Sequence, residues 1–181
     1  MRFIIQLRIG KRITLHTELI MSNRNNHAPR DTTTGKVNED SIKKFLIENF
    51  SGSVFPQTVV GTQFNTNKQH IVDFLLGGEA YKKKQKAIRW TSEHKGGRLV
   101  SVKYQANAGS AEEKVPFEFL KLKDAMKKYG YESAVIVLCG DSGWTLKQEY
   151  LDPETKAHFE SVYPGVTIVD EETFRQQLTT N

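Results

Sequence analysis

Two polar residues stand inside strand-like apolar runs, where their types point to chemistry at a phosphate. Asp73 lies among isoleucine, valine, leucine and phenylalanine in residues 70–76, and Lys103 lies in the alternating run of residues 98–105. A buried carboxylate is costly to desolvate unless a cation meets it. We therefore expect adjacent strands to bring Asp73 and Lys103 to one edge of a sheet, directly paired or joined by a metal ion.

This pair fits the needs of phosphodiester hydrolysis. That reaction requires a metal to neutralise developing charge, a nucleophilic water and a cation near the attacked phosphate. Carboxylate oxygens suit magnesium, and backbone carbonyls complete its shell. Asp73, Lys103 and the carbonyl of Val102 would supply these parts if the two strands lie side by side. The alternative is a buried ion pair that only stabilises the core.

The elements that must position these residues alternate between helix and strand. The expected elements, in chain order, are helix 36–50, two short strands around Pro56, strands 70–76 and 98–105, a helix ending at Tyr129, strand 134–138, a loop and helix over 146–159, strand 166–169 and helix 171–178. Apolar neighbours on both sides of Asp73 favour a central place for its strand. The order predicts an α/β fold with three α/β/α layers around a mixed sheet.

The composition indicates a soluble globular chain. It has 181 residues, of which 38% are hydrophobic and 26% charged, and this is typical of one globular domain. No apolar run approaches the roughly 20 residues of a membrane span. The single cysteine, Cys139, excludes an intramolecular disulfide and lies in an apolar run, so we expect a cytoplasmic protein without membrane contact.

The net charge of +5 suggests an anionic partner, and its distribution is uneven. Residues 1–30 hold six basic groups and one acid, so we expect a basic mobile arm over 1–31 and one domain over 32–181. Residues 81–98 hold seven basic groups against Glu93, which fits a DNA backbone as well as ordinary solvated surface. Trp90 there would stack on bases or lie in the core. The candidate DNA-binding residues are Lys82, Lys83, Lys84, Lys86, Arg89 and Lys114.

Four short segments, in their order along the chain, resemble the PD-(D/E)xK nuclease superfamily, and most closely its restriction-endonuclease-like branch. The segments are residues 35–39, 70–73, 101–105 and 109–114. The resemblance implies a restriction-endonuclease-like core. It also implies that Asp73 binds the metal and that Lys103 orients and activates the water. Gln105 would be the polar residue that often follows the lysine, and Glu39 would be the helix glutamate that supports the metal or its water.

The chain departs from the family pattern at Ser101, which occupies the position of the second acid. A serine cannot supply the missing charge. Some members of the superfamily place this acid on the following helix, and by that resemblance Glu113 is the candidate metal ligand and catalytic acid. Glu112 and Glu118 stand behind it as further candidates.

Ordinary structural roles compete with these assignments. Glu113 and Ser110 have the spacing of a capping box, although Pro116 favours a later helix start or a kink. Glu39 would also suit a helix dipole. We expect His70 to point away from Asp73 and to bind Glu39 or the backbone, and Trp144 to lie in the core.

The resemblance implies a magnesium-dependent DNA endonuclease of restriction type, with Mn2+ as a substitute metal. It would act on double-stranded DNA as a homodimer, because one small domain has one site and a duplex has two strands. One alternative is a structure-specific nuclease, such as a junction resolvase or a nickase. Another is a DNA-binding or assembly domain that kept the fold and lost catalysis.

Overall fold

The computed structural model describes residues 33–64, 66–78, 96–105, 107 and 110–179. These residues belong to one unit that begins at Thr33. The expected basic arm over 1–31 lies outside the described residues. So do Trp90 and five candidate DNA-binding residues, namely Lys82, Lys83, Lys84, Lys86 and Arg89.

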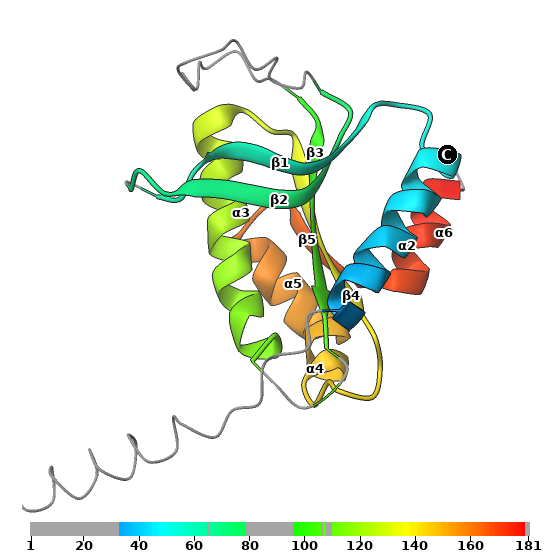
Figure 1. Ribbon diagram of the computed structural model, residues 1–181. Coiled ribbons are helices and arrows are strands. Elements are labelled where there is room, and N and C mark those ends of the chain that lie inside the picture. The colour runs from blue at the N-terminus through cyan, green and yellow to red at the C-terminus, as the bar shows by residue number, and fades with distance from the viewer. Residues whose placement is uncertain (1–32, 65, 79–95, 106, 108–109, 180–181) are drawn as a thin grey trace, which may run out of the picture. The chain divides into compact units, whose positions relative to one another are not determined.

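Five strands form one mixed sheet in which the spatial order follows the chain order. β1 pairs with β2 and β2 with β3 in antiparallel fashion, whereas β3, β4 and β5 are parallel (Figure 1). The strands are β1 Val54–Thr62, β2 Gln69–Leu76, β3 Arg98–Tyr104, β4 Ser133–Cys139 and β5 Val166–Asp170. The helices are α2 Thr33–Asn49, α3 Val115–Tyr129, α4 Lys147–Leu151, α5 Pro153–Val162 and α6 Glu171–Thr179.

Helices cover both faces of this sheet (Figure 1). Side chains alternate across each strand, so neighbouring residues such as Leu99 and Val100 of β3 enter different cores. One core contains Phe119 of α3 together with residues of α4 and α5. The other contains Ile42 of α2 and Phe174 of α6. The chain is therefore α/β with its sheet between two helical layers, as the order of elements predicts.

β1 is a single strand that passes through Pro56, so the expectation of two short strands is wrong. β1 lies at the edge of the sheet, where a proline is tolerated because one side of the strand needs no hydrogen-bond partner. The next residue, Gln57, has φ 46°, a value that few residues other than glycine adopt. The backbone of β1 is therefore irregular directly beside β2.

The alternation of side chains between the two faces of the sheet is interrupted in β2 at Asp73. Val72 and Leu75 are three residues apart yet belong to the same core, whereas Phe74 belongs to the other. Strict alternation would place Val72 and Phe74 on the same face. Pairing of β2 with β3 also ends at Phe74, opposite Val100. β2 lies between the edge strand and the central strand β3, and it separates from β3 where Asp73 stands.

The helix α3 begins at Val115, with Pro116 in its first turn. A short 3-10 turn over Glu112–Lys114 precedes it, and neither the turn nor the helix has a side-chain cap. The capping-box interpretation is therefore wrong, and the later start that Pro116 favours is confirmed. A proline fits the first turn because its missing N–H has no partner there.

Candidate functional site

Where β2 separates from β3, the Asp73 side chain takes the place of a backbone carbonyl as hydrogen-bond acceptor for β3. Its Oδ2 accepts the N–H of Val102 at 2.6 Å. Burial raises the pKa of the Asp73 carboxyl, while Lys103 and the Val102 N–H act in the opposite direction. In an extended strand the N–H and C=O of one residue point to the same side. The carbonyl of Val102 therefore lies on the side that faces the separating β2.

Ser101 links the charged groups of the site. Its Oγ donates to Glu118 Oε1 at 3.0 Å and accepts from Lys103 Nζ at 2.6 Å. The same Oγ lies 3.5 Å from Asp73 Oδ2. A hydroxyl has one hydrogen to donate, and the shorter contact identifies Glu118 as its acceptor. The serine at the expected position of the second acid thus joins Glu118 to Lys103 and lies beside Asp73.

Glu118 is the acid that α3 brings to this cluster. Its carboxylate is buried, with Lys103 Nζ at 3.3 Å and Lys121 Nζ at 2.6 Å from Oε2. Burial opposes ionisation of this group, yet the two ammonium groups and the hydrogen bond from Ser101 hold its pKa at about 2. Glu118 is therefore an anion at any physiological pH, and two cations share it.

Glu39 approaches Asp73 through a glutamine. The amide Nε2 of Gln57 donates to Glu39 Oε1 and lies 3.5 Å from Asp73 Oδ1. Glu39 also contributes to raising the pKa of Asp73. The first turn of α2 holds no acidic residue, so Glu39 lies beyond the reach of the dipole effect. This location favours a place beside the site over a purely helical role.

Gln105 does not join the cluster. Its Nε2 donates to Gly143 O at 2.6 Å, and its Oε1 accepts from Ala111 N at 2.9 Å. The whole amide group is thus used to fasten the end of β3 to two loops. The structure thus places the amide of Gln105 outside the cluster of Asp73, Lys103 and Glu118.

Glu113 and Lys114 lie exposed before α3. In the described part of the chain no hydrogen bond or ion pair joins Glu113 to Asp73 or Lys103, whereas Glu118 contacts Ser101 and Lys103. Glu112 is buried, and its carboxylate accepts the N–H groups of Thr145 and Leu146. These hydrogen bonds hold the Glu112 side chain against the loop before α4.

His70 is fully buried beside the same cluster. Its Nε2 has no hydrogen-bond partner among the described residues. Burial, together with the neighbouring charge of Lys121, lowers the pKa of His70 to about 4. Of the two partners expected for His70, Glu39 or the backbone, Glu39 is bonded by Gln57 in the described residues.

Two residues of the site escape prediction from the sequence, namely Lys121 and Gln57, whereas Glu118 is among the expected alternatives to Glu113. A signal exists for Glu118, which lies on the buried stripe of α3 three residues after Val115 and four before Leu122. A charged residue on such a stripe calls for a partner. Gln57 carries no such signal, because its position depends on the irregular backbone of β1.

The donor set fits a magnesium ion. Magnesium keeps several waters and takes one or two carboxylates from the protein. Asp73, Glu118 and the carbonyl of Val102 offer such a set where β2 leaves β3. Among the described residues no group of three or more histidine, cysteine, aspartate or glutamate side chains gathers as a metal site. A metal here would therefore depend on water for most of its shell.

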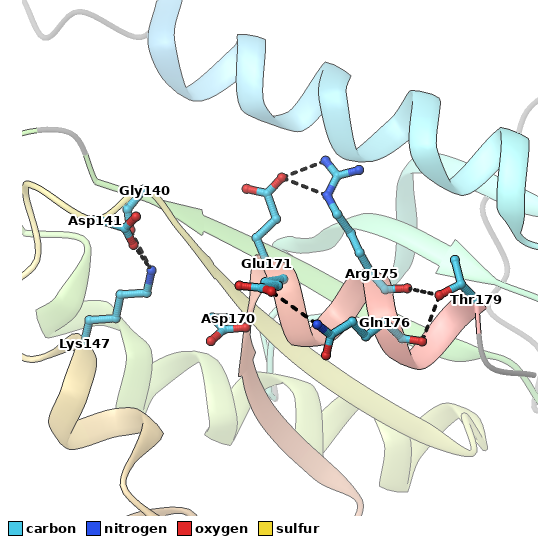
Figure 2. A pocket seen from close by; sticks show the side chains of 9 residues that line it. Gly140, Asp141, Lys147, Asp170, Glu171, Arg175, Gln176 and Thr179 are labelled. Atoms are coloured by element: carbon cyan, nitrogen blue, oxygen red, sulfur yellow. Dashed lines mark hydrogen bonds and ion pairs between the residues drawn. The ribbon is translucent and has the colours of Figure 1, made fainter.

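A second region, a hollow of about 460 Å³, lies at the carboxyl ends of β4 and β5 (Figure 2). Its charged side chains pair within it, Lys147 with Asp141 and Arg175 with Glu171. Asp170 Oδ1 accepts the N–H of Thr173 at 2.7 Å at the start of α6. Such paired charges are typical of solvated surface, so the hollow adds no reactive group to the site.

Comparisons with known proteins do not identify a family, so the roles of the site residues are inferred from the geometry. No family model, no curated protein and no solved structure matches this chain. None of the helices in the described ranges is long and apolar enough to cross a membrane.

Proposed function

We propose that the chain is a metal-dependent DNA endonuclease on a restriction-endonuclease-like core. The supporting observation is that Asp73, Lys103 and Glu118 meet through Ser101 at the point where β2 leaves β3. The resemblance to the PD-(D/E)xK superfamily selects the aspartate and the lysine, and the geometry selects the glutamate. Two carboxylates can hold a metal ion and an ammonium group can stabilise charge at an attacked phosphate, which are the parts that phosphodiester hydrolysis uses in such a site.

Asp73, Glu118 and the Val102 carbonyl would hold Mg2+, or Mn2+ in its place. When bound, the ion would supply charge neutralisation at the phosphate and a bound water of lowered pKa.

Lys103 performs the step that belongs to the chain itself. An ammonium group has three donors, and two of those on Lys103 are directed to Ser101 Oγ and Glu118 Oε2. The third is left to hold the attacking water or a phosphate oxygen. Ser101 and Glu118 thereby fix the direction of the remaining N–H. In-line attack of the water on phosphorus would leave a 5′-phosphate and a 3′-hydroxyl.

A second candidate is a DNA-binding or assembly domain without catalysis, and one observation favours it. The two ammonium groups on Glu118 already neutralise its charge. A metal would have to displace at least one of them. The catalytic proposal therefore requires Lys103 or Lys121 to move when metal and DNA bind.

The experiment compares cleavage of supercoiled plasmid with Mg2+ or Mn2+ by the wild-type chain and by Asp73→Asn, Lys103→Met and Glu118→Gln. We expect each variant to lose at least about 100-fold in rate, as for other groups that act in proton transfer and charge stabilisation. Asp141→Asn and Lys127→Met remove an exposed acid and an exposed lysine elsewhere, and they should cut like the wild type.

Glu113→Gln decides between the two glutamates. We expect it to retain wild-type cleavage, and a loss as large as that of Glu118→Gln would overturn the choice of Glu118. Retained DNA binding without cleavage would establish the second candidate. Cleavage of four-way junctions but not of plasmid would establish a structure-specific nuclease. Sedimentation of the wild-type chain, alone and with duplex DNA, tests the proposed homodimer.

A further inference from the structure

An aromatic pair lies beside the start of α3, next to the candidate site. Phe64 belongs to the connection between β1 and β2, and Phe117 belongs to the first turns of α3. Their ring centroids are 5.6 Å apart with the planes tilted by 49°. Phe117 nevertheless remains 51% exposed, and Leu120, one turn later, is 42% exposed. A contiguous apolar surface of this kind needs a reason that single exposed residues do not.

The backbone of Phe64 is held in a conformation that costs free energy. Its φ of 49° lies in the left-handed region, which a bulky residue rarely adopts. The N–H of Phe64 donates to Asp124 Oδ2 at 3.1 Å, and its carbonyl accepts from Lys128 Nζ. Asp124 and Lys128 also form an ion pair at 2.9 Å. Two charged side chains of α3 thus fix the place of one aromatic ring, and strain maintained in this way clusters at functional surfaces.

The aromatic surface connects directly to the candidate metal acid. Phe117 precedes Glu118 in the chain, and Lys121 Nζ lies 5.9 Å from the Phe117 ring centroid and 2.6 Å from Glu118 Oε2. Lys128 of the same helix pairs with Asp124 and binds the carbonyl of Phe64. The surface therefore offers apolar rings with two ammonium groups beside them, each paired with an acid.

We propose that Phe117, supported by Phe64, binds an unpaired base of the DNA substrate. This inference rests on the proposed nuclease function and names the feature of DNA that the site would select. A nucleotide combines a flat apolar ring with a phosphate, and the surface combines exposed aromatic carbon with ammonium groups. Stacking of bases on aromatic side chains is tolerant of sequence and adds to backbone binding. The substrate would thus carry a flap, a bubble or a flipped nucleotide next to the bond that is cut.

Binding to two matched oligonucleotides tests this proposal without any cleavage. One is a short fluorescein-labelled thymidine oligonucleotide, and the other has the same length and phosphates but abasic residues throughout. Fluorescence anisotropy in EDTA is measured for the wild type and for Phe117→Ala, Phe117→Trp and Phe64→Gly. Glycine adopts the φ of Phe64 without strain, so that variant removes the ring and leaves the turn accessible. Val162→Ala on α5 is the control, because Val162 is also 51% exposed.

We expect Phe117→Ala to weaken binding of the thymidine oligonucleotide roughly tenfold and to leave the abasic oligonucleotide unaffected. Phe64→Gly should weaken the same ligand, while Phe117→Trp and Val162→Ala should bind like the wild type. Equal losses with both oligonucleotides, or no loss with either, would overturn the proposal. A Phe117→Ala variant that changes only the sedimentation behaviour would assign the surface to contact between copies of this chain instead.

Failure of the nuclease proposal is recognised separately, by plasmid cleavage. A wild-type chain that cuts plasmid while Phe117→Ala binds the thymidine oligonucleotide normally would reject the base-binding inference alone.

Discussion

Replacing His70 by phenylalanine should remove a large part of the acid sensitivity of the fold. His70 is buried, and four charged groups lie around it, with Lys121 and Lys103 lowering its pKa and Glu118 and Asp124 raising it. The net result is a pKa of about 4 against an ordinary value of 6.5. Between these two values the unfolded chain binds a proton that the folded chain refuses. The titration of His70 therefore costs no unfolding free energy above pH 6.5, and this cost grows as the pH drops towards 4.

The size of this effect follows from the shift. At 1.36 kcal/mol for each pKa unit, a lowering from 6.5 to about 4 costs roughly 3 kcal/mol of unfolding free energy by pH 4. Phenylalanine keeps a ring in the same space and does not titrate. It also removes a buried nitrogen that has no partner among the described residues, so the variant should be at least as stable as the wild type at neutral pH.

The assay is urea denaturation of both proteins in EDTA, from neutral pH down to about 4. The difference between the two unfolding free energies should grow in favour of His70→Phe as the pH falls. His158→Phe makes the same substitution at an exposed position of α5 and controls for the loss of an imidazole. Parallel curves for the wild type and His70→Phe would refute the reasoning, as would an NMR titration of the His70 ring with a midpoint near its ordinary 6.5.

Two further predictions concern the same fold. Glu118→Gln should lower stability at neutral pH by roughly 3 kcal/mol, because the pKa of Glu118 falls from 4.5 to about 2 in the folded chain. This difference from the wild type should vanish as the pH drops from 4.5 to 2, and a difference that persists in acid would contradict the ion-pair assignment. Gly61→Ala should destabilise by roughly 2 kcal/mol or more in urea denaturation, since a Cβ there would lie 1.9 Å from Tyr129 Cε2. Gly77→Ala has a positive φ but open space around it, so an equal loss in both variants would show that the clash is irrelevant.

The pattern of apolar residues predicts most elements of this fold to within a few residues. The strand expected at 134–138 is observed at Ser133–Cys139, and the closing helix expected at 171–178 ends at Thr179. Periodicity suffices here because burial on one or both faces dictates which residue types recur. The prediction of two short strands failed at Pro56, because an edge strand tolerates a proline that a central strand would exclude.

The candidate site is predictable in part. Asp73 and Lys103 lie on neighbouring strands, as expected from two apolar runs that each contain one charge. Both lie against Ser101 Oγ, with Lys103 Nζ at 2.6 Å and Asp73 Oδ2 at 3.5 Å. Glu118 lies beside Ser101 and Lys103 because it stands on the buried face of α3, between Val115 and Leu122, whereas Glu113 lies exposed before the helix.

The amino-acid sequence by itself places a carboxylate and an ammonium group within two apolar, strand-forming runs, because such runs build the interior of an α/β sheet. Tertiary structure alone decides which further groups complete the set. Gln57, at the irregular point of β1, lies between Asp73 and Glu39 of α2. The packing of α3 likewise decides that Glu118 lies beside Lys103 and that His70 is buried. The rotation of a helix about its axis is fixed by its contacts and not by a local preference of the chain.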